Sequence, residues 1–296
     1  MTRDERLTRL DCRTGTHSDR LGLAKTVRLL NPITFARNLW GHRGLIFQLT
    51  KREVQGRYRG SYLGITWSFL TPLLMLSIFT FVLGVIFRAR WGLQNESRLH
   101  FALVLFCGLI IFNLFAECVT RAPGLVLSHP QYVKKTRFPL EILPVIVLLS
   151  AAAHTVASLL ILLLGLWLGV GILNWTVVWV PLVLLPLVML CLGLSWWLAS
   201  MGVYFRDISQ IIGVATTVVL FPSPIFYPVS AIPEWFQPFY RVNPLTFIIE
   251  NARATLVWGR PPNWLHLVVG MGGNLVVALL GYAWFQRTRK GFADVL

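Results

Sequence analysis

Three consecutive residues, Arg57, Tyr58 and Arg59, form the part of this chain best suited to bind a phosphate group. Arginine makes paired, charge-assisted hydrogen bonds to phosphate oxygens. A glycine on either side of the three lets the backbone approach a ligand, and the tyrosine ring can stack on one. Because this basic segment leads into residues 63–87, which carry no charge until the run ends, we expect it at the mouth of a membrane span.

The sequence shows no further motif for catalysis, nucleotide binding or metal binding. A P-loop of the form G-x-x-x-x-G-K-[ST] and the zinc motif H-E-x-x-H are both missing. The twelve Asp and Glu residues are scattered, and the four cysteines lack paired spacing. We therefore expect no catalytic residue, no metal and no cofactor bound by this chain. A membrane-embedded glycosyl- or acyltransferase ranks low, because its carboxylate or histidine cluster is not found.

The composition is that of an integral membrane protein. Hydrophobic residues make up 55% of the chain and charged residues only 13%, whereas soluble proteins have about 25% charged residues. The net charge of +15 invites a nucleic-acid interpretation. However, thirteen of the 27 Lys and Arg residues precede Leu63, and most of the others flank apolar segments. Membrane topology and anionic headgroups explain this distribution, so we expect no nucleic-acid partner.

Six apolar segments predict an all-α, polytopic fold with six transmembrane helices. These segments cover residues 63–87, 101–120, 142–170, 176–204, 208–221 and 264–285. Six spans place both termini on one side of the membrane, together with 21 of the 27 Lys and Arg residues. By the positive-inside rule we expect both termini in the cytoplasm. Residues 1–32, which are polar and basic, form an N-terminal extension.

Two segments outside these spans have patterns of their own. Residues 33–54 are amphipathic at helical spacing, which predicts a helix lying in the inner membrane interface, although an ordinary packed surface helix fits equally well. Residues 222–263 contain six prolines up to position 244, so no continuous helix is expected there. Since this segment stays apolar and aromatic, it predicts re-entrant or interfacial helices on the outer face.

Three ionisable residues lie in or beside the predicted spans. Glu117 and Arg121 close the second span and are four residues apart with the acid first, the favourable order for a helical ion pair. His154 lies in the third span, and the stretch 142–204 contains no Asp, Glu, Lys or Arg. We favour a neutral histidine bonded to a backbone carbonyl over a proton relay.

At this point the sequence shows a family likeness. Residues 51–73 resemble the start of permease subunits of type-2 ABC exporters for cell-surface polysaccharides, most closely those for O-antigen and teichoic acid. Four further segments are similar as well: residues 132–144, Arg206-Asp207, Asn243-Pro244 and residues 291–295. The likeness covers about residues 33–296, which we take as one transmembrane domain.

The resemblance implies a homodimer in the bacterial inner membrane that works with two separate ATPase subunits. ATP and magnesium would bind to those partners, which accounts for the missing P-loop. The implied substrate is a polysaccharide on an undecaprenyl-diphosphate carrier, and we favour O-antigen. Capsule and teichoic acid polymers remain open, and so does a type-2 exporter of a small amphiphile or drug.

The resemblance also implies roles for particular residues. Contact with the lipid diphosphate is expected from Arg57, Tyr58 and Arg59. A polymer channel is expected to be lined by Trp67, Phe69, Phe226 and Tyr227, although belt residues facing lipid have the same composition. Contact with the ATPase is expected from Arg52, Glu53, Tyr132, Lys134, Lys135 and Arg137. For the last three, ordinary anchoring of a cytoplasmic loop explains the charges without a ligand.

Overall fold

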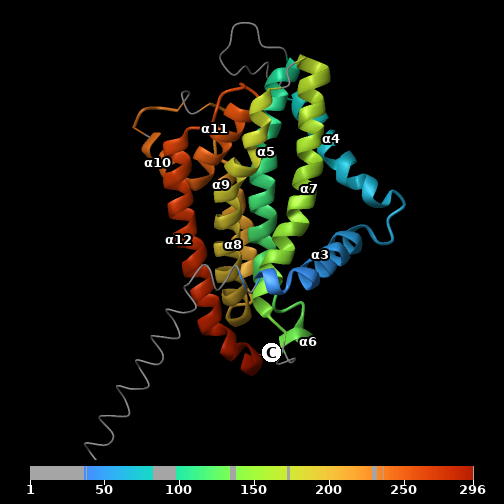
Figure 1. Ribbon diagram of the computed structural model, residues 1–296, viewed down its shortest axis with the longest axis vertical. Helices are drawn as coiled ribbons and strands as arrows, with labels where there is room; N and C mark the ends of the chain where they lie inside the picture. Colours follow the sequence, from blue (N-terminus) through green and yellow to red (C-terminus); the bar gives the residue numbers. More distant parts are fainter. Residues whose placement is uncertain are drawn as a thin grey trace, which may run out of the picture.

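The computed structural model describes residues 37, 39–82, 98–133, 138–171, 174–228, 232–235 and 237–295. All regular structure within these ranges is helical, which confirms the predicted all-α fold. Figure 1 shows the longer helices mostly side by side along the long axis of the molecule. The helices are α3 (Arg43–Tyr58), α4 (Trp67–Phe79), α5 (Arg98–Arg121), α6 (Pro130–Val133), α7 (Leu143–Gly165), α8 (Val180–Tyr204), α9 (Ile208–Leu220), α10 (Gln237–Val242), α11 (Pro244–Leu256), α12 (Trp264–Thr288) and α13 (Phe292–Val295).

Several helical stretches are long and apolar enough to cross a membrane, so the chain is a multi-pass membrane protein. They are Leu99–Gly124, Leu140–Val170, Trp175–Tyr204 and Trp264–Gly291, which contain α5, α7, α8 and α12. Two shorter apolar helices, Trp67–Val82 and Ile208–Leu220, stand where the first and fifth spans are predicted. At 1.5 Å per residue these two measure about 24 and 20 Å, short of a hydrocarbon core of roughly 30 Å. The number of six spans therefore stays a prediction.

The first of these short helices begins later than the predicted span at residue 63. A 3-10 turn, Gly64–Thr66, precedes α4, and Gly64 has a φ of 51°. Such a left-handed conformation suits glycine and interrupts a helix. The predicted end of this span, residues 83–87, lies outside the described residues.

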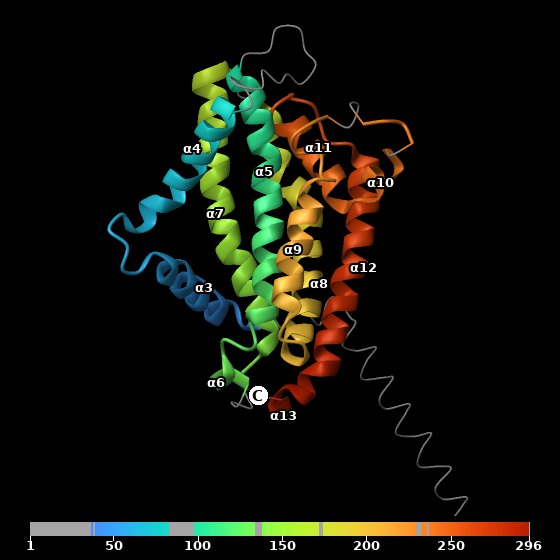
Figure 2. The same ribbon diagram turned by 180° about the vertical axis from the view of Figure 1, so that it is seen from behind.

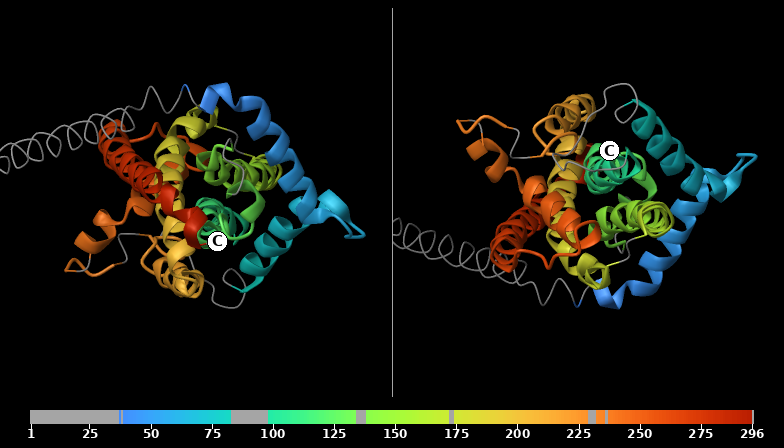
Figure 3. Two further views of the ribbon diagram at one scale, coloured as in Figure 1. Left: turned by 90° about the horizontal axis from the view of Figure 1, so that it is seen from below. Right: turned by 90° about the horizontal axis from the view of Figure 1, so that it is seen from above.

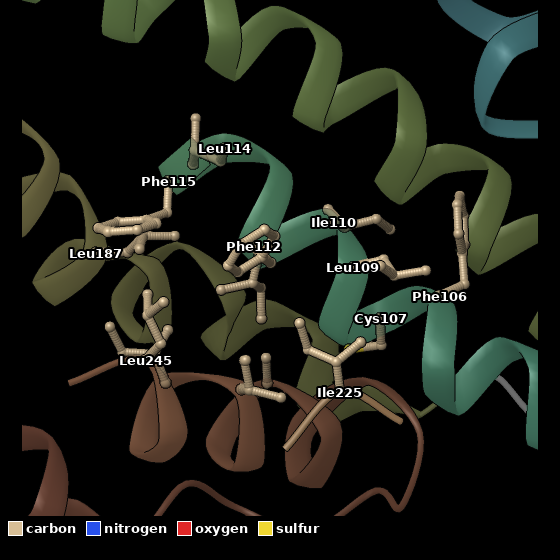
Figure 4. Close-up of a cluster of buried hydrophobic side chains, with 14 of the residues drawn as sticks. Phe106, Cys107, Leu109, Ile110, Phe112, Leu114, Phe115, Leu187, Ile225 and Leu245 are labelled. Carbon is tan, nitrogen blue, oxygen red and sulfur yellow. The ribbon is translucent and has the colours of Figure 1, made fainter. Parts of the chain in front are cut away.

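The central helix is α5. Ala102, Leu103, Val104 and Leu105 are 0% exposed, and the helix packs against α7, α8, α9 and α11. Figure 4 shows its apolar side chains meeting Leu187 of α8 and a layer that includes Ile225 and Leu245. Because these four helices pack against α5, their positions in the bundle depend on this helix.

The helices α8 and α12 approach each other through glycine. A Cβ atom added at Gly193 would lie 2.6 Å from the Val277 carbonyl oxygen, and one added at Gly281 would lie 2.7 Å from the Gly193 carbonyl carbon. Only glycine lets two helix backbones come this close. The pair α8 and α12 therefore forms a closely packed unit.

The segment between α9 and α12 is broken into short helices, in agreement with its prolines. Figures 1 and 2 place α10 and α11 at the end of the bundle opposite the C-terminus. Asn243 caps α11, since its side-chain oxygen accepts a hydrogen bond from the Leu245 N–H at 2.9 Å. Nine of the 13 residues of α11 are buried, so this helix is part of the core.

The helix α3 lies at the opposite end, near α6 and the C-terminus, and crosses α7 (Figure 2). Its apolar stripe faces the bundle: Ile46 is buried, and Leu49 packs against the same cluster. Trp40 and Phe47 are exposed beside the stripe. The helix runs to Tyr58, four residues beyond the predicted segment 33–54. Figure 3, seen along the axis, shows α3 and α4 as an outer arm on one side of the bundle.

Candidate functional site

A cavity of about 1150 Å³ opens between α3 and the connection from α5 to α7. Its walls include Arg52, Glu53 and Arg59 from α3 and its C-cap, and His129 and Tyr132 from the connection. The cavity lies at the end of the bundle that carries α6 (Figure 1). The fold therefore gathers three residues with predicted ATPase contact, Arg52, Glu53 and Tyr132, around one space.

A network of four charged side chains joins α3 to α5 beside this cavity. Arg57 pairs with Glu117, and Arg121 pairs with Glu53 and, at 3.4 Å, with Glu117. The four side chains are between 23% and 32% exposed, so water screens them only in part. The predicted Glu117–Arg121 contact is confirmed. The network has two positive and two negative groups, so it attaches α3 to α5 without a net charge.

The two arginines that the sequence predicts as phosphate ligands line two different hollows. Arg57, paired with Glu117, lines a smaller hollow of about 320 Å³. Arg59 is exposed and lines the 1150 Å³ cavity. Of Tyr58 only the backbone is described. A ligand in the larger cavity meets Arg59 directly, whereas Arg57 shares its charge with a carboxylate.

Tyr132 is held in place by stacking on two other rings. The centroid of its ring lies 4.2 Å from that of Phe138, with 9° between the planes, and 5.4 Å from that of His129, with 7°. Such stacks add to the free energy gained by burial. Tyr132 is therefore a fixed feature of the cavity wall. The neighbouring Lys134, Lys135 and Arg137 lie outside the described residues.

The four aromatic residues that are predicted to line a channel fall into two groups, one near each end of α4. Trp67 and Phe69 stand at the start of α4, where the Trp67 ring N–H donates to the Ser61 hydroxyl at 3.0 Å. Phe226 meets Phe79 near the other end of α4, with 6.1 Å between ring centroids. The structure thus does not bring the four together in one site, but α4 connects the two groups.

Tyr227, beside Phe226, is fixed by hydrogen bonds. Its hydroxyl donates to the Phe221 carbonyl oxygen and also contacts the Tyr240 hydroxyl. Burial, and next the contact with Tyr240, raise the pKa of Tyr227 above its ordinary value. This phenol therefore stays neutral at physiological pH and can take part in hydrogen bonds.

A buried arginine that sequence reasoning missed connects three segments at the end of the bundle that carries α10 and α11. Arg253 of α11 is 0% exposed and donates to the carbonyl oxygens of Val104 at 3.2 Å, Pro224 at 2.5 Å and Ile225 at 2.9 Å, and to Glu250 at 3.1 Å. It joins α5, α11 and the turn after α9. The signal in the sequence was a single basic residue in the apolar stretch of α11.

His154 has charged neighbours that its own span does not supply. It lines the 320 Å³ hollow together with Arg57 and Glu117, which come from α3 and α5. These charges lie 37 or more positions away from His154 in the sequence, on other helices, so they are not visible in the third and fourth spans. Within the described residues, no group of three or more His, Cys, Asp or Glu side chains forms a potential metal site.

Comparison with known proteins gives one family and several relatives. The ABC-2 type transporter family matches residues 44–257. The chain is 30% identical to the O-antigen export system permease protein RfbA of Myxococcus xanthus, covering 88% of this chain and 99% of that protein. A Klebsiella pneumoniae protein of the same name is 24% identical, covering 85% and 95%. The capsule polysaccharide export inner-membrane protein CtrC of Neisseria meningitidis is 23% identical, covering 88% and 97%.

Proposed function

Because the chain belongs to the ABC-2 type transporter family, we propose that it is the permease subunit of an ATP-driven polysaccharide exporter. The favoured substrate is O-antigen carried on undecaprenyl diphosphate. The relatives support this choice, since those at 30% and 24% identity are named permeases of O-antigen export systems.

The observation that carries the proposal is the cavity between α3 and the α5–α7 connection. The sequence has no P-loop, so a separate ATPase subunit must supply the energy. Arg52, Glu53 and Tyr132 in the cavity wall form the surface on which that subunit docks. In the sequence Lys134, Lys135 and Arg137 follow directly, and we assign them to the same contact.

The proposed orientation places this cavity in the cytoplasm of a bacterial cell. Six spans in the inner membrane leave both termini on the cytoplasmic side, where 21 of the 27 Lys and Arg residues then lie. The short helices α4 and α9 serve as the first and fifth spans. The segment with α10 and α11 faces the opposite side, which supports its interpretation as a re-entrant structure.

The proposed path for the substrate starts at the basic end of α3 and follows α4. Arg57, Tyr58 and Arg59 contact the carrier diphosphate, and the aromatic residues at both ends of α4 border the polymer. Phe69 is 44% exposed, so its ring is available to a partner. A second copy of the chain closes the path, which makes the working unit a homodimer with two ATPase subunits.

A second candidate function is export of a capsule polymer. The observation in its favour is the relative named for capsule polysaccharide export at 23% identity. The relatives named here do not point to teichoic acid or to a small amphiphile, so we rank these lower.

The test is deletion of the gene in its native host and complementation with the wild-type chain. We expect lipid-linked polymer to accumulate inside the cell and the corresponding surface polymer to disappear. Labelling the carrier and the O-antigen or capsule sugars separately identifies which polymer is retained. Unchanged surface polysaccharide in the deletion strain, combined with loss of efflux of a small lipophile, would contradict the proposal.

A further inference from the structure

The hollow of about 320 Å³ among α4, α5 and α7 has an unusual lining for an apolar bundle. Polar side chains from all three helices converge on it: Ser68 and Thr71 from α4, Asn113 and Glu117 from α5, and His154 and Ser158 from α7. Polar groups at membrane depth are costly and are kept for function more often than not. Their convergence makes this hollow a candidate binding site.

The helix α5 has an apolar buried part and one polar face. Its apolar residues are almost all buried, yet Asn113 and Thr120 are exposed and Glu117 is half-buried. Their spacing of three and four residues puts them on one face of the helix. Among the described residues the Asn113 side chain has no hydrogen-bond partner. An exposed amide with no partner in the described part of the protein can both donate and accept hydrogen bonds, so this face is suited to a ligand with hydroxyl groups.

An aromatic ring completes the lining. Trp67, the first residue of α4, is 37% exposed, and its ring N–H is fixed by the Ser61 hydroxyl. A ring held in this way offers a flat apolar surface. Sugars are ligands that suit both an apolar ring and polar side chains. Their C–H faces stack on aromatic rings, and their hydroxyls form hydrogen bonds with amides and carboxylates.

The hollow lies next to the two arginines that are proposed to bind the carrier diphosphate. Arg57, which pairs with Glu117, lines it, while Arg59 two residues on lines the larger cavity. We propose that the hollow binds the sugar directly attached to the carrier diphosphate, with the diphosphate at Arg57 and Arg59. A volume of about 320 Å³ is at the lower end for small-molecule sites and suits a single sugar unit. This inference rests on the proposed function.

The experiment measures binding of two kinds of carrier lipid to the full chain in nanodiscs. One kind is bare undecaprenyl diphosphate, and the other kind carries a single sugar, which is N-acetylglucosamine in one lipid and galactose in a second. We expect the wild-type chain to bind at least one of the sugar-bearing lipids more tightly than the bare lipid. Asn113→Leu should weaken sugar-lipid binding about three- to tenfold, the effect of one neutral hydrogen bond, and leave bare-lipid binding unchanged.

Two controls separate this role from a structural one. Gln210→Leu removes an exposed amide from α9, outside the hollow, and should change neither affinity. The thermal unfolding midpoint of Asn113→Leu should equal or exceed that of the wild type, since the substitution removes no hydrogen bond within the described part of the protein. If the wild type binds bare and sugar-bearing lipids equally, or Asn113→Leu changes neither, the sugar site is refuted while the export function stands. If the wild type binds neither lipid, the lipid-diphosphate substrate of the proposed function fails as well.

Discussion

At the scale of single residues, the charges of this protein are neutralised in two different ways. Arg57 is neutralised by a carboxylate, Glu117, in a partly exposed network. Arg253 is wholly buried, and three backbone carbonyl oxygens plus Glu250 receive its hydrogen bonds. The signs of the charges can therefore be exchanged between Arg57 and Glu117. At position 253, by contrast, only a guanidinium has the shape to donate to all of these acceptors.

We predict that Arg57→Glu destabilises the attachment of α3 to α5, because it places two carboxylates together. The loss should be about 1 kcal/mol, since the pair is partly exposed. Adding Glu117→Arg to form the reversed pair should recover part of this loss, since Arg121, the second partner of Glu117, then faces a like charge. Thermal unfolding of the purified protein at low and high salt measures both effects. A double variant as unstable as the sum of the single ones would show that the pair does not interact.

We predict that Arg253→Met lowers the free energy of unfolding by about 3 kcal/mol, because several buried carbonyl groups lose their donor. Gly108→Ala should act in the same direction, since its Cβ would lie 2.9 Å from the Arg253 Nη2 atom. The control is Arg260→Gln, an exposed arginine between α11 and α12. Limited proteolysis after α9 and thermal unfolding report the change. Equal stability of the Arg253 and Arg260 variants would contradict the role of Arg253.

At the scale of elements, α8 and α12 form the most closely packed pair. Gly193 and Gly281 bring the two backbones together, whereas Gly272 and Gly273 of α12 have nothing within 4 Å of an added Cβ. One helix thus carries glycines with two different roles. This allows a comparison of matched substitutions on the same element.

We predict that Gly281→Ala destabilises the protein by about 1–3 kcal/mol, since the helices must move apart. Gly272→Ala should be neutral or stabilising, because alanine favours a helix by up to about 1 kcal/mol over glycine. Thermal unfolding of both variants in the same detergent measures the difference. Equal unfolding midpoints would mean that the close approach of α8 and α12 contributes nothing to stability.

The sequence was sufficient to predict the bounds of those helices that lie in long stretches without charged residues. The helices α7 and α8 lie within residues 142–204, which contain no Asp, Glu, Lys or Arg. The predicted bounds 142–170 and 176–204 agree closely with the apolar helical stretches Leu140–Val170 and Trp175–Tyr204. The start of α4 was missed, because the backbone at Gly64, not hydrophobicity, decides where that helix begins. Hydropathy does not report the φ of a single glycine.

Most of the candidate site could not be predicted from the sequence, because its contacts join distant segments. Arg57 and Glu117 are 60 positions apart, and Arg121 and Glu53 are 68. The spacing rule found only the contact within one helix, Glu117 with Arg121. For the same reason the position of His154 beside Arg57 became visible only in the folded chain.

At the scale of the whole molecule, the proposed orientation makes a direct prediction. A cysteine in place of Arg206 should lie in the cytoplasm and one in place of Arg260 outside, because these residues occupy opposite ends of the bundle. Cys12→Ser provides the background, since Cys107, Cys118 and Cys191 are buried. A membrane-impermeant maleimide should label only Arg260→Cys in intact cells with a permeable outer envelope, and both after the inner membrane is opened. The reverse labelling pattern would invert the topology.

The shortness of α9 has a consequence for the surrounding bilayer. This helix is about 20 Å long, against about 36 Å for the 24-residue α5 beside it. Ile211, Val214 and Val218 are exposed along it, so lipid that meets this face encounters a hydrophobic mismatch of roughly 10 Å. Lipid adapts to such a mismatch by local thinning. Thinning beside α9 would shorten the hydrocarbon barrier next to Phe226 and Tyr227, the two residues of the proposed path that follow α9 in the chain.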